Sequence, residues 1–437
     1  MIKNFKGLAL TLIAAMLLAL LSACSGSSGK EGASGTDQPA AGKRVTITAW
    51  HGASGESAKF LENIVKQYNE SQSSATVKLV FVDTDNMVTK LTAAAAGNAL
   101  PEVGMLMWPM WLGPLKDVVK PLDEYIQAEP DKWNEDDFLN GLIDGNVRFD
   151  GVTYGIPIET NNRALYYNKK LFEEAGLTPP KTWDELVEAA QKLTDPAKKR
   201  WGMSLPTTQG GALDAAWAPF MWQAGGDYVN AEGTELQFNG EGGIAATQFF
   251  ADLINKHKVA SLSPPQNGFQ SGMIAMSISG PWSIPTLNAN EKLDYGIAPL
   301  PEGTKGKATI LGGTNNFIFK TTPEKEKAAW DFLTWLSTPE KTAEFAVGYG
   351  SIPIRKSSSD AAVWKDFVKE NPDIQVHIDG YQYGRYQPFN VLTLTEITEV
   401  ITSHIEAAMH NKETAEEAMK KAYEESKPLL KTWSSSK

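Results

Sequence analysis

The chain has 437 residues, of which 42% are hydrophobic and 21% are charged, and its formal net charge is −11 at pH 7. This length suits two or three domains with an ordinary hydrophobic core, so stability requires neither disulfides nor metals. An acidic chain without basic runs argues against nucleic acid as a partner, because binding to phosphates needs clustered Lys and Arg.

The N-terminus has the pattern of an export signal. Two lysines precede an apolar run over residues 8–21, and small residues follow it. The run is shorter than the roughly 20 residues that span a bilayer. The tetrad Leu-Ser-Ala-Cys at 21–24 resembles a bacterial lipobox, which implies a signal peptide over residues 1–23 and a lipid on Cys24, the only cysteine.

Residues 24–43 are rich in Gly and Ser and contain almost nothing to bury, which predicts a flexible tether. We therefore expect the folded part to begin near Arg44, outside the cytoplasm, and to be held at the cell membrane through Cys24.

The first part of the folded chain alternates strands and helices. Runs of β-branched and apolar residues predict strands at 45–50, 76–82 and 103–108. Apolar residues at helical spacing predict a helix over 56–71, and a helix-prone run over 86–97 stops at a glycine. This β-α-β-α-β order predicts a parallel sheet with right-handed crossovers.

Local signals continue along the chain. Asp150-Gly151 lies between two strand-like runs and predicts a two-residue hairpin. Further strands are predicted at 164–168 and 272–280, and an amphipathic helix over 242–258. The last sixty residues have a largely helical pattern.

Helix starts and stops are also marked. Thr182 with Glu185, and Thr414 with Glu417, have the spacing of a capping box. Thr-Pro-Glu-Lys opens a helix at both 322 and 338, with Pro at the first helical position. A helix from Lys169 is expected to end at Gly176.

Several segments together resemble the bacterial extracellular solute-binding proteins of sugar-type ABC importers. They are "TAWHGASGE", "LYYNKKLFEEAGLTPPKTWDELVEAAQKL", "GMIAMSISGPW", "YGSIPI" and "NKETAEEAMKKA". The resemblance runs from about Val45 to Leu430, and within the family the chain is similar to maltose-binding and glycerol-3-phosphate-binding proteins.

The resemblance implies an α/β, two-lobe periplasmic-binding-protein-like fold with a hinge and a ligand cleft between the lobes. Lobe one would comprise residues 44–158 plus 310–350, and lobe two residues 163–307 plus 355–437. Closure of the lobes would bury the ligand, a motion for which periplasmic binding proteins are a general example.

A sugar is bound by side chains that donate and accept hydrogen bonds and by aromatic rings that stack on its C–H faces. In open parallel sheets, ligands bind beyond the carboxyl ends of the strands. Candidates in lobe one are Trp50, His51, Ser54, Asp83, Trp108, Trp111, Gly313 and Asn315.

Three kinds of these residues have alternative roles. The tryptophans can be core residues, His51 can lie in a surface loop, and Asp83 can be a helix N-cap. Pro109 ends the third strand directly after Trp108, so we expect Trp108 to be the main stacking platform and Trp111 a secondary one. The glycines of "GGTNN", 312–316, precede a predicted strand and would allow close backbone approach to a ligand.

The crossing segments and lobe two add candidates through the resemblance. Asn161 falls near a position where relatives hold a sugar-binding carboxylate, and Asn162 is beside it. Trp217 and Trp282 match aromatic positions of sugar-binding relatives. Arg385 lies in the region where phosphate-binding relatives carry an arginine.

Catalytic signals are weak. The five histidines are scattered, and the chain lacks a metalloprotease, nucleophile-elbow, phosphate-loop or dinucleotide motif. We read His404 and His410 as surface residues, and we expect no catalytic residue, metal or cofactor. The predicted function is a monomeric carbohydrate receptor that delivers its ligand to an ABC permease. The alternatives are a receptor for glycerol-3-phosphate or a glycerophosphodiester, which would use Arg385, and a surface-anchored glycosidase with paired carboxylates.

Overall fold

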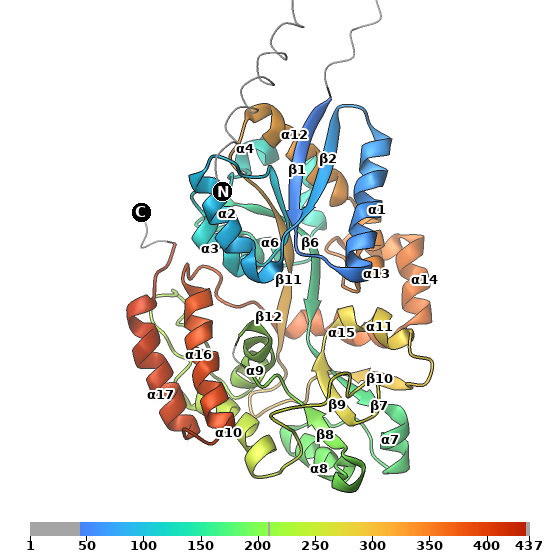
Figure 1. Cartoon of the computed structure of the whole chain (residues 1–437), viewed down its shortest axis with the longest axis vertical. Coiled ribbons are helices and arrows are strands. Elements are labelled where there is room, and N and C mark those ends of the chain that lie inside the picture. Colours follow the sequence, from blue (N-terminus) through green and yellow to red (C-terminus); the bar gives the residue numbers. More distant parts are fainter. Residues whose placement is uncertain (1–43, 209, 434–437) are drawn as a thin grey trace, which may run out of the picture. The chain divides into compact units, whose positions relative to one another are not determined.

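The computed structural model describes residues 44–208 and 210–433, and within them the chain forms two main sheets (Figure 1). The strands of the first sheet are β1 (Val45–His51), β2 (Ala75–Phe81), β3 (Val103–Met107), β6 (Gly155–Asn162), β11 (Thr309–Ile318) and β12 (Gly384–Arg385). Those of the second sheet are β7 (Ala164–Asn168), β8 (Trp201–Ser204), β9 (Ile274–Ser279) and β10 (Tyr295–Ala298). The predicted alternation of strands and helices is therefore confirmed.

The first sheet has the order β12-β11-β3-β1-β2, with β6 also paired to β11. β1 is parallel to both β2 and β3, which confirms the parallel sheet predicted from the element order. The carboxyl ends of β1, β2 and β3 therefore lie along one edge, and His51 pairs with Phe81 at that edge. This edge is where the predicted aromatic and polar residues follow the strands.

β6 and β11 form an antiparallel ribbon that leaves the first sheet and leads toward the second (Figure 1). β11 pairs with β6 over residues 311–317 and with β12 at its first two residues. Toward its end it also pairs with β3, with Asn315 opposite Met107. A third segment joins them, because Thr160 and Ile352 exchange backbone hydrogen bonds of 3.1 and 2.8 Å. The segment around Ile352 therefore lies alongside the two crossing strands.

The second sheet has the order β10-β7-β9-β8, in which β7 follows β6 after a single residue, Arg163. β8 and β9 are parallel, whereas β7 is antiparallel to β9. Consequently the start of β7 and the carboxyl ends of β8 and β9 lie at the same edge. That edge is the one from which the crossing strands emerge.

Between and around these strands lie helices and a small hairpin of β4 (Arg148–Phe149) and β5 (Val152–Thr153). The helices up to residue 200 are α1 (Gly55–Ser71), α2 (Met87–Ala96), α3 (Leu112–Leu115), α4 (Asp123–Ala128), α5 (Pro130–Trp133), α6 (Leu142–Asn146), α7 (Lys169–Glu174) and α8 (Trp183–Leu193). The later helices are α9 (Gly211–Gln223), α10 (Glu241–Asn255), α11 (Ile284–Asn288), α12 (Pro323–Leu336), α13 (Pro339–Tyr349), α14 (Ala362–Glu370), α15 (Gln375–Gly380), α16 (Leu394–Met409) and α17 (Ala415–Ser426).

The local signals of the sequence correspond to real turns and caps. Asp150 and Gly151 both have positive φ, 54° and 77°, as a tight hairpin turn requires. Thr414 and Glu417 form a complete capping box. The box at Thr182 is only half formed, since Thr182 Oγ1 accepts from the Glu185 backbone N–H while the Glu185 carboxylate accepts from that of Lys181.

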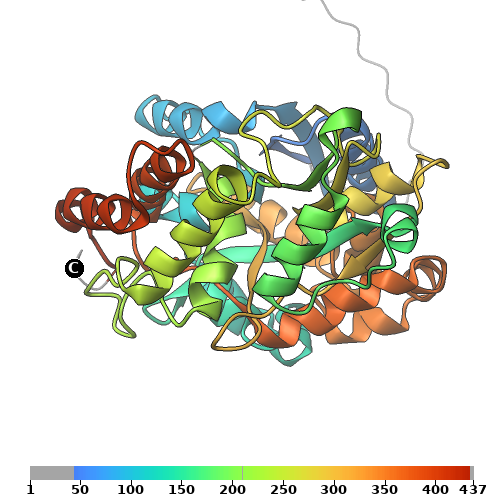
Figure 2. The ribbon, with the colours of Figure 1, turned by 90° about the horizontal axis from the view of Figure 1, so that it is seen from below.

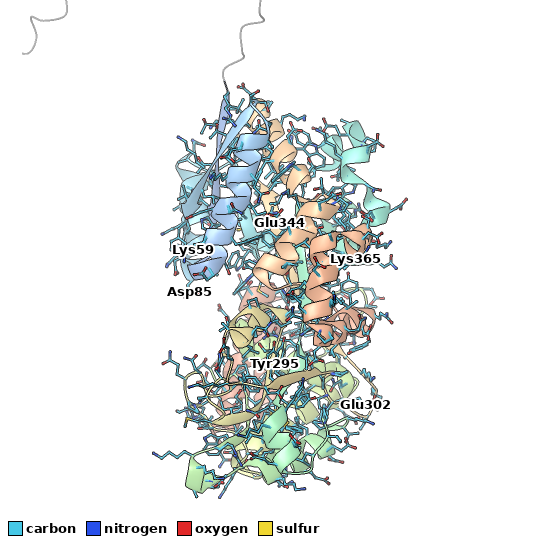
Figure 3. All side chains as sticks on the ribbon, turned by 90° about the vertical axis from the view of Figure 1, so that its right-hand side faces the viewer. Lys59, Asp85, Tyr295, Glu302, Glu344 and Lys365 are labelled. Atoms are coloured by element: carbon cyan, nitrogen blue, oxygen red, sulfur yellow. The ribbon has the colours of Figure 1, made fainter. Side chains whose placement is uncertain are left out.

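α1 and α13 lie side by side against the first sheet. Gln67 donates to Glu344 at 2.7 Å, and the rings of Phe60 and Phe345 meet edge to face. Figure 3 shows Lys59 and Glu344 on these two helices and Tyr295 on the second sheet. α16 and α17 form a neighbouring pair, drawn in red in Figure 2, that packs against α9 and α10.

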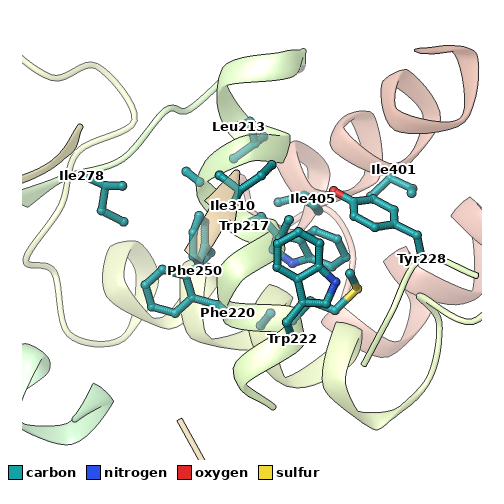
Figure 4. Close-up of a cluster of buried hydrophobic side chains, with 14 of the residues drawn as sticks. Leu213, Trp217, Phe220, Trp222, Tyr228, Phe250, Ile278, Ile310, Ile401 and Ile405 are labelled. Atoms are coloured by element: carbon teal, nitrogen blue, oxygen red, sulfur yellow. The ribbon is translucent and has the colours of Figure 1, made fainter. Parts of the chain in front are cut away.

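α9 is buried nearly all round, which is expected of a helix that is hydrophobic on every face. Trp217, Phe220 and Trp222 project from it into a cluster of apolar side chains (Figure 4). That cluster also takes Ile401 and Ile405 from α16, so the C-terminal helices complete the core beside the second sheet.

Candidate ligand-binding site

Trp108 and Trp111 follow β3 as predicted, but they differ in exposure. Trp108 precedes a 3₁₀ turn over Pro109–Trp111 and is 42% exposed, whereas Trp111 is 7% exposed. Proline suits the first position of the turn because its φ is already fixed and it has no N–H to satisfy. Trp108 is available to stack on a ligand, while Trp111 belongs to the core with Met107 and Leu112.

The end of β1 is less exposed than the sequence suggested. His51 is 5% exposed, and burial lowers its pKa, with Glu62 acting in the opposite sense. The His51 ring is therefore mostly enclosed at the end of β1 and does not lie in a surface loop, whereas its contact with a ligand stays a prediction. Trp50 is partly buried against the core, and Ser54 is exposed as the N-cap of α1 without a capping hydrogen bond from its side chain.

The end of β2 presents a residue that the sequence analysis missed. Phe81 is 56% exposed and meets the His51 ring edge to face at 6.1 Å. The feature that could have identified Phe81 is its position at the end of β2, the strand next to β1. Asp83 follows two residues later, and its Oδ1 accepts from the Asp85 N–H at 3.2 Å and from Asn86 Nδ2 at 3.1 Å. The predicted role of Asp83 as a cap is confirmed, and its contact with a ligand stays a prediction.

One face of β6 carries Glu159 and Asn161, because side chains two apart on a strand point the same way. Glu159 is buried and accepts hydrogen bonds of 3.1 Å from Asn161 Nδ2 and from Thr314 Oγ1. Burial raises the pKa of Glu159 to about 7, against the weaker opposing effect of these hydrogen bonds. Asn161 is partly exposed above it and can offer its amide to a ligand.

Gly312 and Gly313 face this part of β6 on the neighbouring strand. Gly313 has φ +135°, and a Cβ there would lie 2.4 Å from the backbone oxygen of Glu159. A Cβ on Gly312 would lie 2.8 Å from Asn161 Oδ1. The two glycines let the strands of the ribbon approach closely. They lie within β11, and not before it as the sequence analysis expected.

Asn162 and Asn315 are not free to bind a ligand in this structure, contrary to expectation. Asn162 is 1% exposed and exchanges hydrogen bonds of 2.7 Å with the backbone oxygen and Nδ1 of His377. Asn315 is fully buried, and its Oδ1 accepts from Asn146 Nδ2 at 2.9 Å. Asn162 points to the face of β6 opposite Asn161, so its amide fixes α15 to the ribbon.

Trp282 follows β9 in a 3₁₀ turn over Pro281–Ser283 and is partly buried. Its ring covers Gly280, where a Cβ would lie 2.0 Å away, and the carbonyl of Gly280 accepts from Tyr166 at 2.7 Å. The Arg163 guanidinium lies over the Trp282 ring at 4.6 Å. Arg163 was not predicted, and it lies at the junction of β6 and β7.

Two other predicted residues have different partners. Trp217 is fully buried, and its indole N–H donates to Thr247 at 3.1 Å, so it is a core residue and not a stacking platform. Arg385 is exposed, but its guanidinium is ion-paired with Asp227 and lies 5.1 Å from the Trp222 ring. Nη2 of Arg385 is therefore already paired with a carboxylate.

The prediction that His404 and His410 are surface residues holds only for His410. His404 is partly buried, and its Nδ1 lies 2.8 Å from Glu413. Hollows of about 310 Å³ beside Arg355 and about 410 Å³ beside Trp433 contain none of the predicted ligand residues. The candidate site is thus defined by side chains at the strand ends and on the ribbon.

In the described parts of the chain, no three or more His, Cys, Asp or Glu side chains are grouped to hold a metal ion. Within the same residues no helix combines the length and the apolar character needed to cross a membrane. The predicted signal peptide, the tether and the lipid site at Cys24 lie outside the described residues.

Comparison with known proteins finds the same family that the sequence resembles. Residues 52–343 match the family model of the bacterial extracellular solute-binding proteins. The sn-glycerol-3-phosphate-binding periplasmic protein UgpB of Rhizobium meliloti is 25% identical over 394 residues, which cover 86% of this chain and 91% of that protein. A maltotriose-binding protein of Pyrococcus abyssi is 26% identical over 322 residues, 70% of this chain and 66% of that protein.

A solved structure, that of the cyclic alpha-maltosyl-1,6-maltose binding protein from Arthrobacter globiformis, has a TM-score of 0.76 and 27% identity. The match covers 87% of this chain and 98% of that one. Similarity over this extent confirms the predicted α/β, two-lobe fold.

Proposed function

The chain belongs to the family of bacterial extracellular solute-binding proteins, and on that premise we propose that it is the carbohydrate-binding receptor of an ABC importer. The observation that carries the proposal is the exposed Trp108 at the carboxyl end of β3, beside the ribbon that presents Asn161. A hexose needs both partners, since its C–H face stacks on an aromatic ring and its hydroxyls need amide or hydroxyl groups.

The ligand would bind between the two lobes, with Trp108 and Ser54 on one side and Trp282 on the other. The proposed lobes are residues 44–158 plus 310–350 and residues 163–307 plus 355–437. The crossing strands β6 and β11 would act as the hinge, and closure would bury the sugar. A closed receptor then presents its ligand to the permease, and we propose that a lipid on Cys24 keeps it at the membrane.

The receptor for a glycerol phosphate remains the second candidate because of the relative UgpB. Its predicted phosphate ligand, Arg385, is committed to Asp227, which weakens that assignment. A glycosidase needs two carboxyl groups across the scissile bond. Glu159 is held by Asn161 and Thr314, and a receptor that returns its ligand unchanged is the simpler proposal.

Titration calorimetry of the mature protein with neutral oligosaccharides, hexoses, glycerol-3-phosphate and glycerophosphodiesters tests the proposal. We expect a carbohydrate to bind with micromolar or tighter affinity and to be recovered unchanged. Binding of glycerol phosphates alone would favour the second candidate. Appearance of shortened sugars after incubation would show a glycosidase.

A further inference from the structure

Arg163 differs from every other arginine in the described parts of the chain. Arg44, Arg148, Arg200, Arg355 and Arg385 each donate a side-chain hydrogen bond to a carboxylate or a backbone carbonyl. For the Arg163 guanidinium, the residues described provide a ring contact with Trp282 and no hydrogen-bond acceptor or carboxylate within bonding distance. Among the described residues, the five N–H donors of the Arg163 guanidinium therefore have no acceptor, and they can bind a ligand or water.

The environment makes this arrangement unfavourable without a ligand. Arg163 is only partly exposed, and burial lowers the pKa of its guanidinium to about 10. A cation removed from water costs free energy unless an anion or good acceptors compensate it. A ring contact of this kind contributes about 0.5–2 kcal/mol and satisfies none of the N–H groups.

The backbone of Arg163 is held in place by hydrogen bonds, and the residue lies beside the candidate ligand-binding site. Thr309 Oγ1 accepts from the backbone N–H of Arg163 at 3.1 Å and donates to its carbonyl at 2.7 Å. Arg163 directly follows β6, the strand that carries Asn161, and it precedes β7 of the second sheet. Stacking on Trp282 holds the planar guanidinium beside the ring proposed to contact the sugar.

We propose that Arg163 binds an anionic group of the ligand, and that the natural ligand is an acidic carbohydrate. The planar fork of an arginine matches the two oxygens of a carboxylate or a phosphate, with which it forms paired hydrogen bonds. The anionic group is therefore a uronate carboxylate or a sugar phosphate. This inference rests on the proposed function and narrows it.

The buried carboxyl of Glu159 on β6 does not serve as the partner of Arg163. Glu159 is four residues away along the strand, roughly 13 Å at 3.3 Å per residue. Its carboxyl already accepts hydrogen bonds from Asn161 and Thr314. The charge of Arg163 is thus directed to the ligand and not to a carboxylate of the ribbon.

The test uses three matched ligands: a neutral hexose oligosaccharide, the same oligosaccharide with one hexose oxidised to a uronate, and its phosphate monoester. Affinities are measured by calorimetry for the wild-type mature protein and for Arg163→Gln, Arg163→Lys and the control Arg385→Gln. We expect one anionic ligand to bind at least ~10-fold more tightly than the neutral one, with an affinity that falls as salt rises. The uronate and the phosphate identify which anion is recognised.

Arg163→Gln should remove this preference. The affinity for the anionic ligand should fall by about 10- to 100-fold, which is the range expected when a charged hydrogen-bonding group is lost. Arg163→Lys should retain part of it, because the charge remains, and Arg385→Gln should retain all of it. Equal wild-type affinity for the neutral and anionic ligands, or an equal loss for all three in Arg163→Gln, would overturn the inference and leave a sugar receptor standing. If none of the three binds to the wild type, the proposed function fails together with the inference.

Discussion

The rings of Trp108 and Trp111 lie 4.9 Å apart, yet one is exposed and the other is part of the core. Two residues lie between them along the chain, and the 3₁₀ turn that begins after Trp108 and ends at Trp111 directs one ring outward and the other inward. This relationship gives a matched pair of substitutions in which chemistry is constant and burial differs.

Trp108→Ala should weaken carbohydrate binding by about 10-fold or more, since aromatic contacts dominate many interfaces, with a small change in the free energy of unfolding. Trp111→Ala should lower the free energy of unfolding by about 3–5 kcal/mol, because it leaves a cavity. Urea unfolding and ligand titration of both variants measure the two effects. A large stability loss in Trp108→Ala with unchanged affinity would return Trp108 to the core.

Gly313 and Gly312 form a second pair. Gly313→Ala should lower the free energy of unfolding by more than about 1 kcal/mol, because φ is +135° and the new Cβ meets a backbone oxygen. Gly312→Ala should cost less stability, since the Asn161 side chain that it meets can move, but should weaken ligand binding through that movement. Thermal unfolding with and without ligand separates the two. Similar stability of both variants would contradict the close approach at Gly313.

The ligand-free protein should lose stability as the pH rises from about 4.5 to 7. Burial raises the pKa of Glu159 to about 7 in the folded chain, above its ordinary value of 4.5. Between these values the folded state keeps a proton that the unfolded chain releases, so the free energy of unfolding falls, by up to about 3 kcal/mol for this group. Below 4.5 the contribution is complete, and above 7 it is lost.

Glu159→Gln should remove the part of this slope that belongs to Glu159. The remainder should come from Asp214, whose pKa burial also raises to about 7 despite hydrogen bonds from Tyr228 and Gln387. Asp214→Asn is therefore the matched control, and the two changes should add because the groups are on separate elements. Urea unfolding at pH 5, 6, 7 and 8 gives the curves. An unchanged curve for Glu159→Gln would show that the Glu159 carboxyl ionises normally.

Arg385→Gln should leave ligand affinity within about twofold of the wild type and change stability by no more than about 1 kcal/mol, as for an exposed ion pair. The reason is that Arg385 is paired with Asp227 and is partly exposed to solvent. Calorimetry with a carbohydrate and with glycerol-3-phosphate is the measurement. Selective loss of glycerol-3-phosphate binding would support the phosphate role originally predicted for Arg385.

Much of the fold could be predicted because it depends on local chemistry. Thr414 and Glu417 satisfy each other's backbone within one turn, and Asp150-Gly151 needs only its own positive φ values. The parallel strands followed from their alternation with helices. Such features depend only on neighbouring residues, so they can be predicted from the sequence.

The site residues that were missed or wrong depend on distant partners. Asn161 and Asn162 are the same residue type at adjacent positions. Successive side chains on a strand point to opposite faces, so only one of the two can face a ligand. Trp217 resembles a binding residue until α10 and α16 enclose it. Arg163 gave no signal because the ring that it contacts, that of Trp282, follows β9 and is far from Arg163 in the sequence.

The ribbon of β6 and β11 has a mechanical consequence. Backbone hydrogen bonds along its length resist stretching and sliding, whereas a two-stranded ribbon bends easily out of its plane. We propose that the two sheets tilt toward each other by this bending, without a change in the length of their connection. Asn161 is on this ribbon and Arg163 directly follows β6. A ligand that contacts both residues would therefore bind to the element that is proposed to bend, so that ligand binding and bending of the ribbon would be coupled.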